Sequence, residues 1–129
     1  MTQKKKTPAT ILIVEDERSL NEAYQTILTK SGYEVFSAFD GEEALEMTSK
    51  MEPTLILLDL RMPRMDGIGF LEHYDLKVKH PHVKVIVFSN YDMQKEIDEA
   101  YRLGAERYIL KAWASPKELL QVVENTLEG

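Results

Sequence analysis

The chain has 129 residues, 43% of them hydrophobic and 29% charged, which is typical of one globular domain with a core of its own. Its formal net charge of −6 argues against direct binding of nucleic acid, which requires a basic surface. The absence of cysteine excludes a disulfide framework and a thiolate metal site, and no apolar run approaches the ~20 residues that span a bilayer. We expect a flexible N-terminal tail over residues 1–9, one domain over residues 10–129 and no membrane partner.

Short runs rich in isoleucine, valine and leucine predict β-strands. They cover Thr10–Val14, Glu34–Ala38, Thr54–Leu58, Val83–Phe88 and Arg107–Leu110. After each run, apolar residues recur every three to four positions, which predicts a helix; the first of these faces comprises Leu20, Tyr24, Ile27 and Leu28. This alternation predicts an α/β fold, a doubly wound (βα)5 parallel five-stranded sheet with helices on both faces.

Helix boundaries are also visible in the sequence. Ser31–Gly32 is predicted to end the first helix and His80–Pro81 the third. Ser115 is the expected N-cap of the last helix, with Pro116 at the first helical position and Glu118 completing a capping box.

Polar residues follow four of the predicted strands, at the point where each strand ends. Glu15 and Asp16 follow the first strand, Asp59 the third, Ser89 the fourth and Lys111 the fifth. Parallel strands bring their carboxyl ends to one edge of the sheet, where open α/β sheets place their chemistry. The second strand ends without a titratable group, so we expect it at the edge of the sheet.

Three carboxylates in one small volume repel one another unless a cation or a proton offsets them. Carboxylate oxygens are hard ligands that suit Mg²⁺, which also prefers sites shared with phosphate oxygens. A hydroxyl and an ammonium opposite the metal would bind the remaining oxygens of a phosphoryl group. The set therefore favours phosphoryl transfer to Asp59 with formation of an acyl phosphate, although each residue alone would be an ordinary loop residue.

With these residues the chain resembles the receiver domains of two-component response regulators over Thr10 to Leu127. The matching segments, in order, are Ile11–Glu17, Leu57–Pro63, Asp66–Gly67, Ser89, Leu103–Ala105, Tyr108 and Lys111. The resemblance implies a flavodoxin-like sheet with strand order 2-1-3-4-5. It also implies a phosphorelay protein of the cytoplasm that a histidine kinase or a phosphotransfer protein phosphorylates.

The resemblance also implies individual roles. Asp59 would be the phosphoacceptor, and Asp16 and Asp59 would bind Mg²⁺ directly, with Glu15 acting directly or through water. The backbone carbonyl of Arg61 would be a further metal ligand.

Lys111 would pair with Asp59 or the phosphoryl group, Ser89 would donate a hydrogen bond to a phosphoryl oxygen, and Tyr108 would change rotamer with that movement. An output domain or partner would bind the face formed by the fourth helix, the fifth strand and the fifth helix. We expect weak dimerisation or a heterologous partner on this face.

The sequence departs from the family pattern at two positions. Ala112 follows Lys111 where the family usually has proline, often with a cis peptide, and a cis bond before a non-proline residue costs about 3 kcal/mol. The loop that carries Lys111 is therefore expected to take another path, on which the reach of the lysine depends. Asn90 stands where a small alanine is common, next to the expected entry of the phosphodonor.

Two other functions compete with a phosphorylated switch. A phosphohydrolase that forms an aspartyl phosphate would carry a second acid two residues after the nucleophile, and this position is Arg61. An interaction module without chemistry would lack part of the acid, hydroxyl or lysine set, which is complete here. We therefore expect a switch that catalyses only its own phosphorylation and dephosphorylation. His73, His80 and His82 cluster around the end of the third helix and the loop into the fourth strand, and we predict that they are surface residues at the opposite edge of the sheet.

Overall fold

The computed structural model describes residues 8–90 and 93–128, apart from the side chain of Trp113. Residues 1–7 of the expected flexible tail lie outside the described residues, so that expectation stays a prediction. Within the described part of the chain, no helix is both long and apolar enough to cross a membrane.

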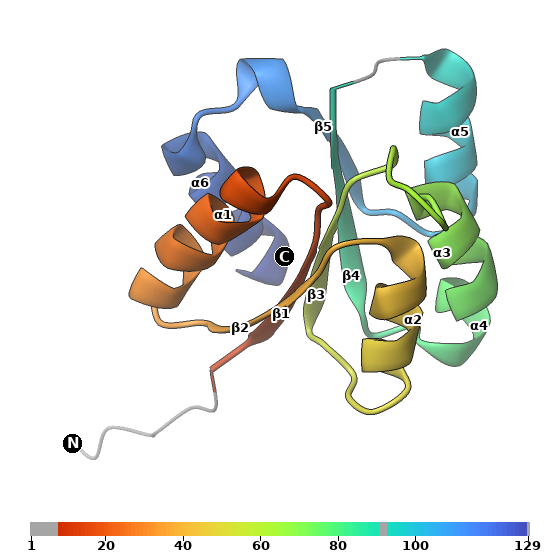
Figure 1. Cartoon of the computed structure of the whole chain (residues 1–129), viewed down its shortest axis with the longest axis horizontal. Helices are drawn as coiled ribbons and strands as arrows, with labels where there is room; N and C mark the ends of the chain where they lie inside the picture. Colours follow the sequence, from red (N-terminus) through yellow and green to blue (C-terminus); the bar gives the residue numbers. More distant parts are fainter. Residues whose placement is uncertain (1–7, 91–92, 129) are drawn as a thin grey trace.

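A parallel five-stranded sheet forms the centre of the molecule, in the order β2-β1-β3-β4-β5 (Figure 1). The strands are β1 (Thr10–Val14), β2 (Glu34–Ala38), β3 (Leu55–Leu58), β4 (Lys84–Ser89) and β5 (Arg107–Leu110). The predicted fold class and strand order are confirmed, with β3 and β4 each beginning one residue later than predicted. β2 is an edge strand, as expected from its lack of a titratable end.

Helices cover both faces of the sheet (Figure 1). One face carries α1 (Arg18–Lys30) and α6 (Pro116–Glu128). The other carries α2 (Gly41–Thr48), α3 (Gly67–Tyr74), α4 (Leu76–Lys79) and α5 (Gln94–Arg102). A short 3-10 turn, η1 (Lys111–Trp113), links β5 to α6.

The strands divide their side chains between two cores, because successive residues of a strand point to opposite faces. In β1, Leu12 and Val14 join the core under α2, α3 and α5, whereas Ile11 and Ile13 join the core under α1 and α6. Every residue of β3 is buried, as expected for a strand covered on both faces. The two cores hold the ends of the central strands in fixed register.

The stretch between β3 and β4 differs from the prediction of one helix that ends at His80–Pro81. Asp75 adopts a left-handed conformation with φ of 56° and separates α3 from α4. Aspartate tolerates this conformation better than most residues, because its short polar side chain can bond locally. The fourth and fifth helices of the sequence prediction are consequently α5 and α6.

The predicted helix boundaries are confirmed at two further points. Gly32, with φ of 98°, follows the last turn of α1, where a left-handed residue commonly ends a helix. Ser115 Oγ accepts a hydrogen bond from Glu118 N at 3.2 Å, and Glu118 Oε1 accepts one from Ser115 N at 2.8 Å. These reciprocal bonds form the expected capping box at the start of α6.

Candidate phosphoacceptor and metal site

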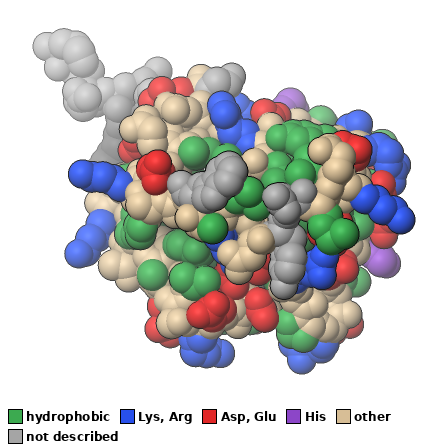
Figure 2. All heavy atoms as spheres, turned by 90° about the horizontal axis from the view of Figure 1, so that it is seen from above, with side chains coloured by type: hydrophobic (Ala, Val, Ile, Leu, Met, Phe, Trp, Pro, Cys, Tyr) green, Lys and Arg blue, Asp and Glu red, His purple; other side chains and the backbone are tan. Residues whose placement is uncertain are grey.

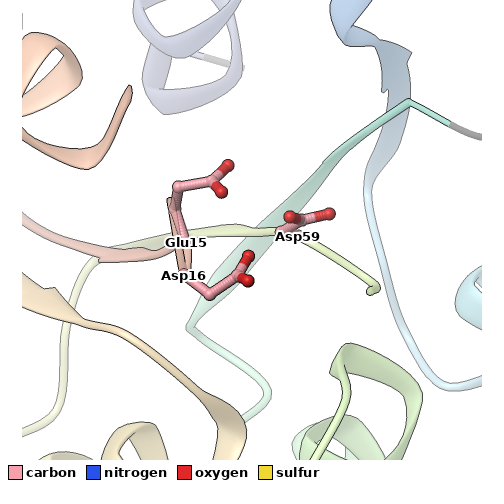
Figure 3. Close-up of side chains that lie close together, drawn as sticks. All are labelled: Glu15, Asp16 and Asp59. Atoms are coloured by element: carbon pink, nitrogen blue, oxygen red, sulfur yellow. The ribbon is translucent and has the colours of Figure 1, made fainter. Parts of the chain in front are cut away.

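Three carboxylates meet at the carboxyl edge of the two central strands. Val14 pairs with Leu58, so Glu15 and Asp59 leave neighbouring strands at the same level. The Asp59 amide donates to Val14 O at 2.9 Å, and the Glu15 amide donates to Ala38 O at 3.1 Å, so the ladder bonds continue past the strand ends. One carboxylate oxygen from each of Glu15, Asp16 and Asp59 lies within 4.8 Å of the other two (Figure 3).

Lys111 supplies the positive charge of this cluster. Its ammonium binds Glu15 Oε1 and lies 3.2 Å from Asp59 Oδ2, and all three side chains are at least nine-tenths buried. No peptide bond of the described residues is cis, and the chain after Lys111 forms the η1 turn. Lys111 therefore reaches the carboxylates although Ala112 replaces the proline usual in the family.

Burial and the lysine act in opposite directions on the acids. Burial raises the pKa of Glu15, and the hydrogen bond from Lys111 offsets only part of that rise. Burial likewise raises the pKa of Asp59 against the attraction of the same ammonium. For Lys111, burial disfavours the ammonium, but the hydrogen bond to Glu15 and the charge of Asp59 raise its pKa overall. The pocket thus holds more negative charge than one lysine compensates.

This donor set fits a hard divalent cation such as Mg²⁺. A cavity of about 300 Å³ opens beside it, lined by Glu15, Asp16, Glu17, Asp59, Arg61, Asn90 and Lys111. Asp16 is exposed at this cavity, whereas both oxygens of Glu15 have protein donors: Lys111 Nζ and the Glu17 amide at 3.0 Å. Asp16 is therefore better placed than Glu15 to bind a metal directly.

Figure 2 looks down on this edge of the sheet and shows acidic side chains in the central and lower part of the face, with lysine and arginine mainly around its rim. In the part of the chain that the structure describes, Glu15, Asp16 and Asp59 are the group of acidic or histidine residues that could hold a metal. The backbone amide of Arg61 lies 3.4 Å from Asp59 Oδ1. The backbone of Arg61, whose carbonyl is a predicted metal ligand, is therefore next to the Asp59 carboxylate.

The remaining predicted residues lie on the α5 side of the sheet. Ser89 is fully buried and is the last residue of β4. It shares its face of the strand with Val85 and Val87, which belong to the core under α5. Tyr108 is half-buried and packs against the same core. The structure therefore places the hydroxyl and the ring on the same face of the sheet.

Sequence reasoning missed Asn21, a fully buried residue of α1 beside the acidic cluster. Its position was visible as a polar residue on the buried face of α1, three residues before Tyr24 and seven before Leu28. Tyr24 also adjoins the site, and burial, partly offset by the charge of Lys111, raises its pKa to about 12.

The histidines lie outside the site. His73 and His82 are exposed, as predicted. His80 is only partly exposed, because its ring stacks on Tyr74 at 4.0 Å between centroids and its Nδ1 lies 2.7 Å from Glu52 Oε2. His80 is thus a partly exposed residue away from the site, packed on an aromatic ring that the fold brings there.

The chain is similar to known proteins in sequence. The family model of the response regulator receiver domain matches residues 11–124. Sporulation initiation phosphotransferase F of Bacillus subtilis is 36% identical over 78% of this chain and 80% of its own length. The probable transcriptional regulator ycf27 of Porphyridium aerugineum is 38% identical over 91% of this chain, which spans 47% of that relative.

Solved structures show the same fold. A CheY-like response regulator receiver domain protein from Methanospirillum hungatei superposes with a TM-score of 0.88 and 30% identity, covering 95% of both chains. A chemotaxis response regulator of Vibrio cholerae superposes with a TM-score of 0.84 and 27% identity, covering 93% of this chain and 99% of the other. From its family match, its relatives and its fold, the chain belongs to the receiver domains of two-component response regulators.

Proposed function

We propose that Asp59 is the phosphoacceptor of this receiver domain. A phosphohistidine on a histidine kinase or a phosphotransfer protein is the proposed donor. The P–N bond of the donor breaks, a P–O bond forms to a carboxylate oxygen of Asp59, and the imidazole leaves with the electron pair. The observation that carries this proposal is the place of Asp59, at the end of a buried strand and in contact with Lys111.

Glu15, Asp16, Asp59 and the carbonyl of Arg61 are the proposed holders of Mg²⁺. When bound, the metal would neutralise charge on the phosphoryl oxygens, which is the main requirement of this reaction. Lys111 then pairs with a phosphoryl oxygen in place of one carboxylate, and Ser89 donates a hydrogen bond to another. The residues themselves supply positioning: Asp59 is held by its ladder bond to Val14 and by Lys111.

The chain is a signalling domain, and we propose that its catalysis is limited to its own phosphorylation and dephosphorylation. A phosphohydrolase would need a proton donor two residues after Asp59, and a guanidinium at that position keeps its proton. Arg61 Nη2 lies 3.1 Å from Glu96 on α5, so its side chain is directed to the helix.

We propose that phosphorylation is read on the face formed by α5, β5 and α6, where an output domain or a separate partner binds. The curated ycf27 relatives are about twice the length of the matched region, and their printed names describe probable transcriptional regulators. For this chain, signalling in the cytoplasm without direct nucleic acid binding is part of the proposal, in line with the net charge of −6.

The test is labelling by acetyl phosphate, or binding of beryllofluoride, in the presence of Mg²⁺. Wild type should be modified, and Asp59→Asn should not. Asp66→Asn is the matched control, because Asp66 is an exposed acid in the same loop whose N-cap bond to Gly69 an asparagine can keep. Equal labelling of wild type and Asp59→Asn would contradict the assignment.

The readout face is tested by amide-shift mapping with and without beryllofluoride. We expect changes at Ser89, Tyr108 and α5 in addition to the pocket. A ligand shifts such an equilibrium only by its differential contacts with the two states. Changes confined to the pocket would show that signalling does not use this face.

A further inference from the structure

Asn21 holds the segment that carries Asp16 from both sides. Its Nδ2 donates to the carbonyl oxygen of Glu15 at 2.9 Å, and its backbone amide donates to the carbonyl oxygen of Glu17 at 2.9 Å. Asp16 lies between these two anchored residues. Its own side chain is exposed, so its carboxylate depends on the backbone for its position.

The amide of Asn21 is fixed in one orientation. Its Nδ2 donates a second bond, to Ala38 O at 3.2 Å, and its Oδ1 accepts from Ser37 Oγ at 2.7 Å and from Gln25 Nε2 at 2.9 Å. Two carbonyl oxygens can only accept, so the nitrogen must face them. All four hydrogen-bonding positions of this buried amide are therefore used.

These bonds join α1 to the ends of two strands. Ala38 is the last residue of β2, and its carbonyl oxygen also accepts from the Glu15 amide at 3.1 Å. Asn21 thus closes a ring that contains the end of β1, the end of β2 and the first turn of α1. In a metal site, such supporting bonds to the ligand-bearing residues typically change affinity 10–100-fold when they are lost.

We propose that Asn21 is a positioning residue for the metal site, whose side chain sets the place of Asp16 by holding the backbone carbonyl of Glu15. The proposal rests on the proposed function, since it assigns Mg²⁺ to this pocket. Asn21 has no direct part in the binding of the metal. Its effect is to keep the Asp16 carboxylate within reach of the other oxygen ligands before the metal arrives.

The first measurement is Mg²⁺ affinity, obtained from amide shifts of the folded protein during titration. Asn21→Ala should weaken Mg²⁺ binding about tenfold. Asn21→Asp should weaken binding too, although it adds a negative charge, because an oxygen then faces the carbonyls of Glu15 and Ala38. Ser37→Ala removes only the hydrogen bond from Ser37 Oγ to Asn21 Oδ1, and its Mg²⁺ affinity should lie between those of Asn21→Ala and wild type.

Leu28→Val is the matched control for a loss of stability. Leu28 is fully buried near the other end of α1, so this variant lowers the melting temperature and should leave Mg²⁺ affinity within about twofold of wild type. An Asn21→Ala protein that is folded and binds Mg²⁺ as wild type does would overturn the proposal. An equal loss of affinity in Leu28→Val would do the same.

The second measurement is amide hydrogen exchange without metal. Asn21→Ala should accelerate exchange of the Glu15 and Glu17 amides, which donate to Ala38 O and Glu15 Oε2, relative to the amides of α1, and Leu28→Val should not. If wild type shows no Mg²⁺ binding, the metal assignment under the proposed function fails, and exchange alone decides the proposed anchoring. Unchanged exchange at Glu15 and Glu17 would then refute it.

Discussion

Replacing Lys111 by methionine should destabilise the domain and make its stability strongly dependent on pH. The substitution keeps the length and apolar stem of the side chain and removes the ammonium that binds Glu15 and Asp59. Removing one partner of a buried ion pair costs about 3–5 kcal/mol. Because the pocket opens to water on one side, we expect the loss of unfolding free energy to be at the lower end of this range, about 3 kcal/mol. For a domain of this size, such a loss lowers the melting temperature by about 10 °C.

The sign of the pH effect follows from the two acids. Burial already raises the pKa of Glu15 and Asp59, and without the lysine their pKa values should rise further. At pH values between the pKa of these acids in the unfolded chain and their higher pKa in the folded protein, the native state binds more protons than the unfolded state. The folded protein of the variant therefore becomes more stable as pH falls through that range. The stabilising contribution of Lys111 in wild type is lost only above its ordinary pKa of 10.5, as pH rises through the raised value.

The assay is urea unfolding of wild type and Lys111→Met at several pH values from 5 to 8. The difference in unfolding free energy should be largest at pH 8 and should shrink toward pH 5. Lys117→Met, at an exposed lysine in the first turn of α6, is the control and should stay within about 0.5 kcal/mol of wild type throughout. A difference that is independent of pH, or below about 1 kcal/mol at pH 8, would refute the reasoning.

Three further outcomes are expected. In a Mg²⁺ titration, Asp16→Ala should lose more affinity than Glu15→Gln, because Asp16 is exposed at the cavity while both oxygens of Glu15 have protein donors; the reverse order would contradict this division. Gly67→Ala should unfold at markedly lower urea, since a Cβ there would lie 2.5 Å from the carbonyl oxygen of Asp59; wild-type stability would show that this loop can shift. Ser115→Ala should cost about 1 kcal/mol in thermal unfolding by loss of the N-cap, and its Mg²⁺ affinity should not change.

The sequence predicts those features of the fold and the site that depend on local patterns. A run such as Ile11–Val14 gives the strand, and the acid after it must emerge at the carboxyl edge. Because parallel strands end at the same edge, the convergence of Glu15, Asp16 and Asp59 follows once the strands are adjacent.

Features set by packing between distant segments could not be predicted in this way. The break in the helix at Asp75 is not marked by a glycine or proline. The next residue, Leu76, packs so closely on Gly104 that a Cβ added to Gly104 would lie 2.8 Å from Leu76 Cδ2. The path of the chain after Lys111 depended on how Ala112 is accommodated. The role of Asn21 became visible only when its partners on β1 and β2 were in place.

The contact between Glu15 and Lys111 also bears on when, during synthesis and folding, the site is completed. Its two residues are 96 positions apart, and Lys111 directly follows β5, the last strand along the chain. A chain that is still being synthesised can present Asp59, yet it lacks the ammonium of Lys111 beside its acids until β5 has docked beside β4. Under the proposed function, a nascent chain, or one clipped before Lys111, should therefore accept a phosphoryl group poorly.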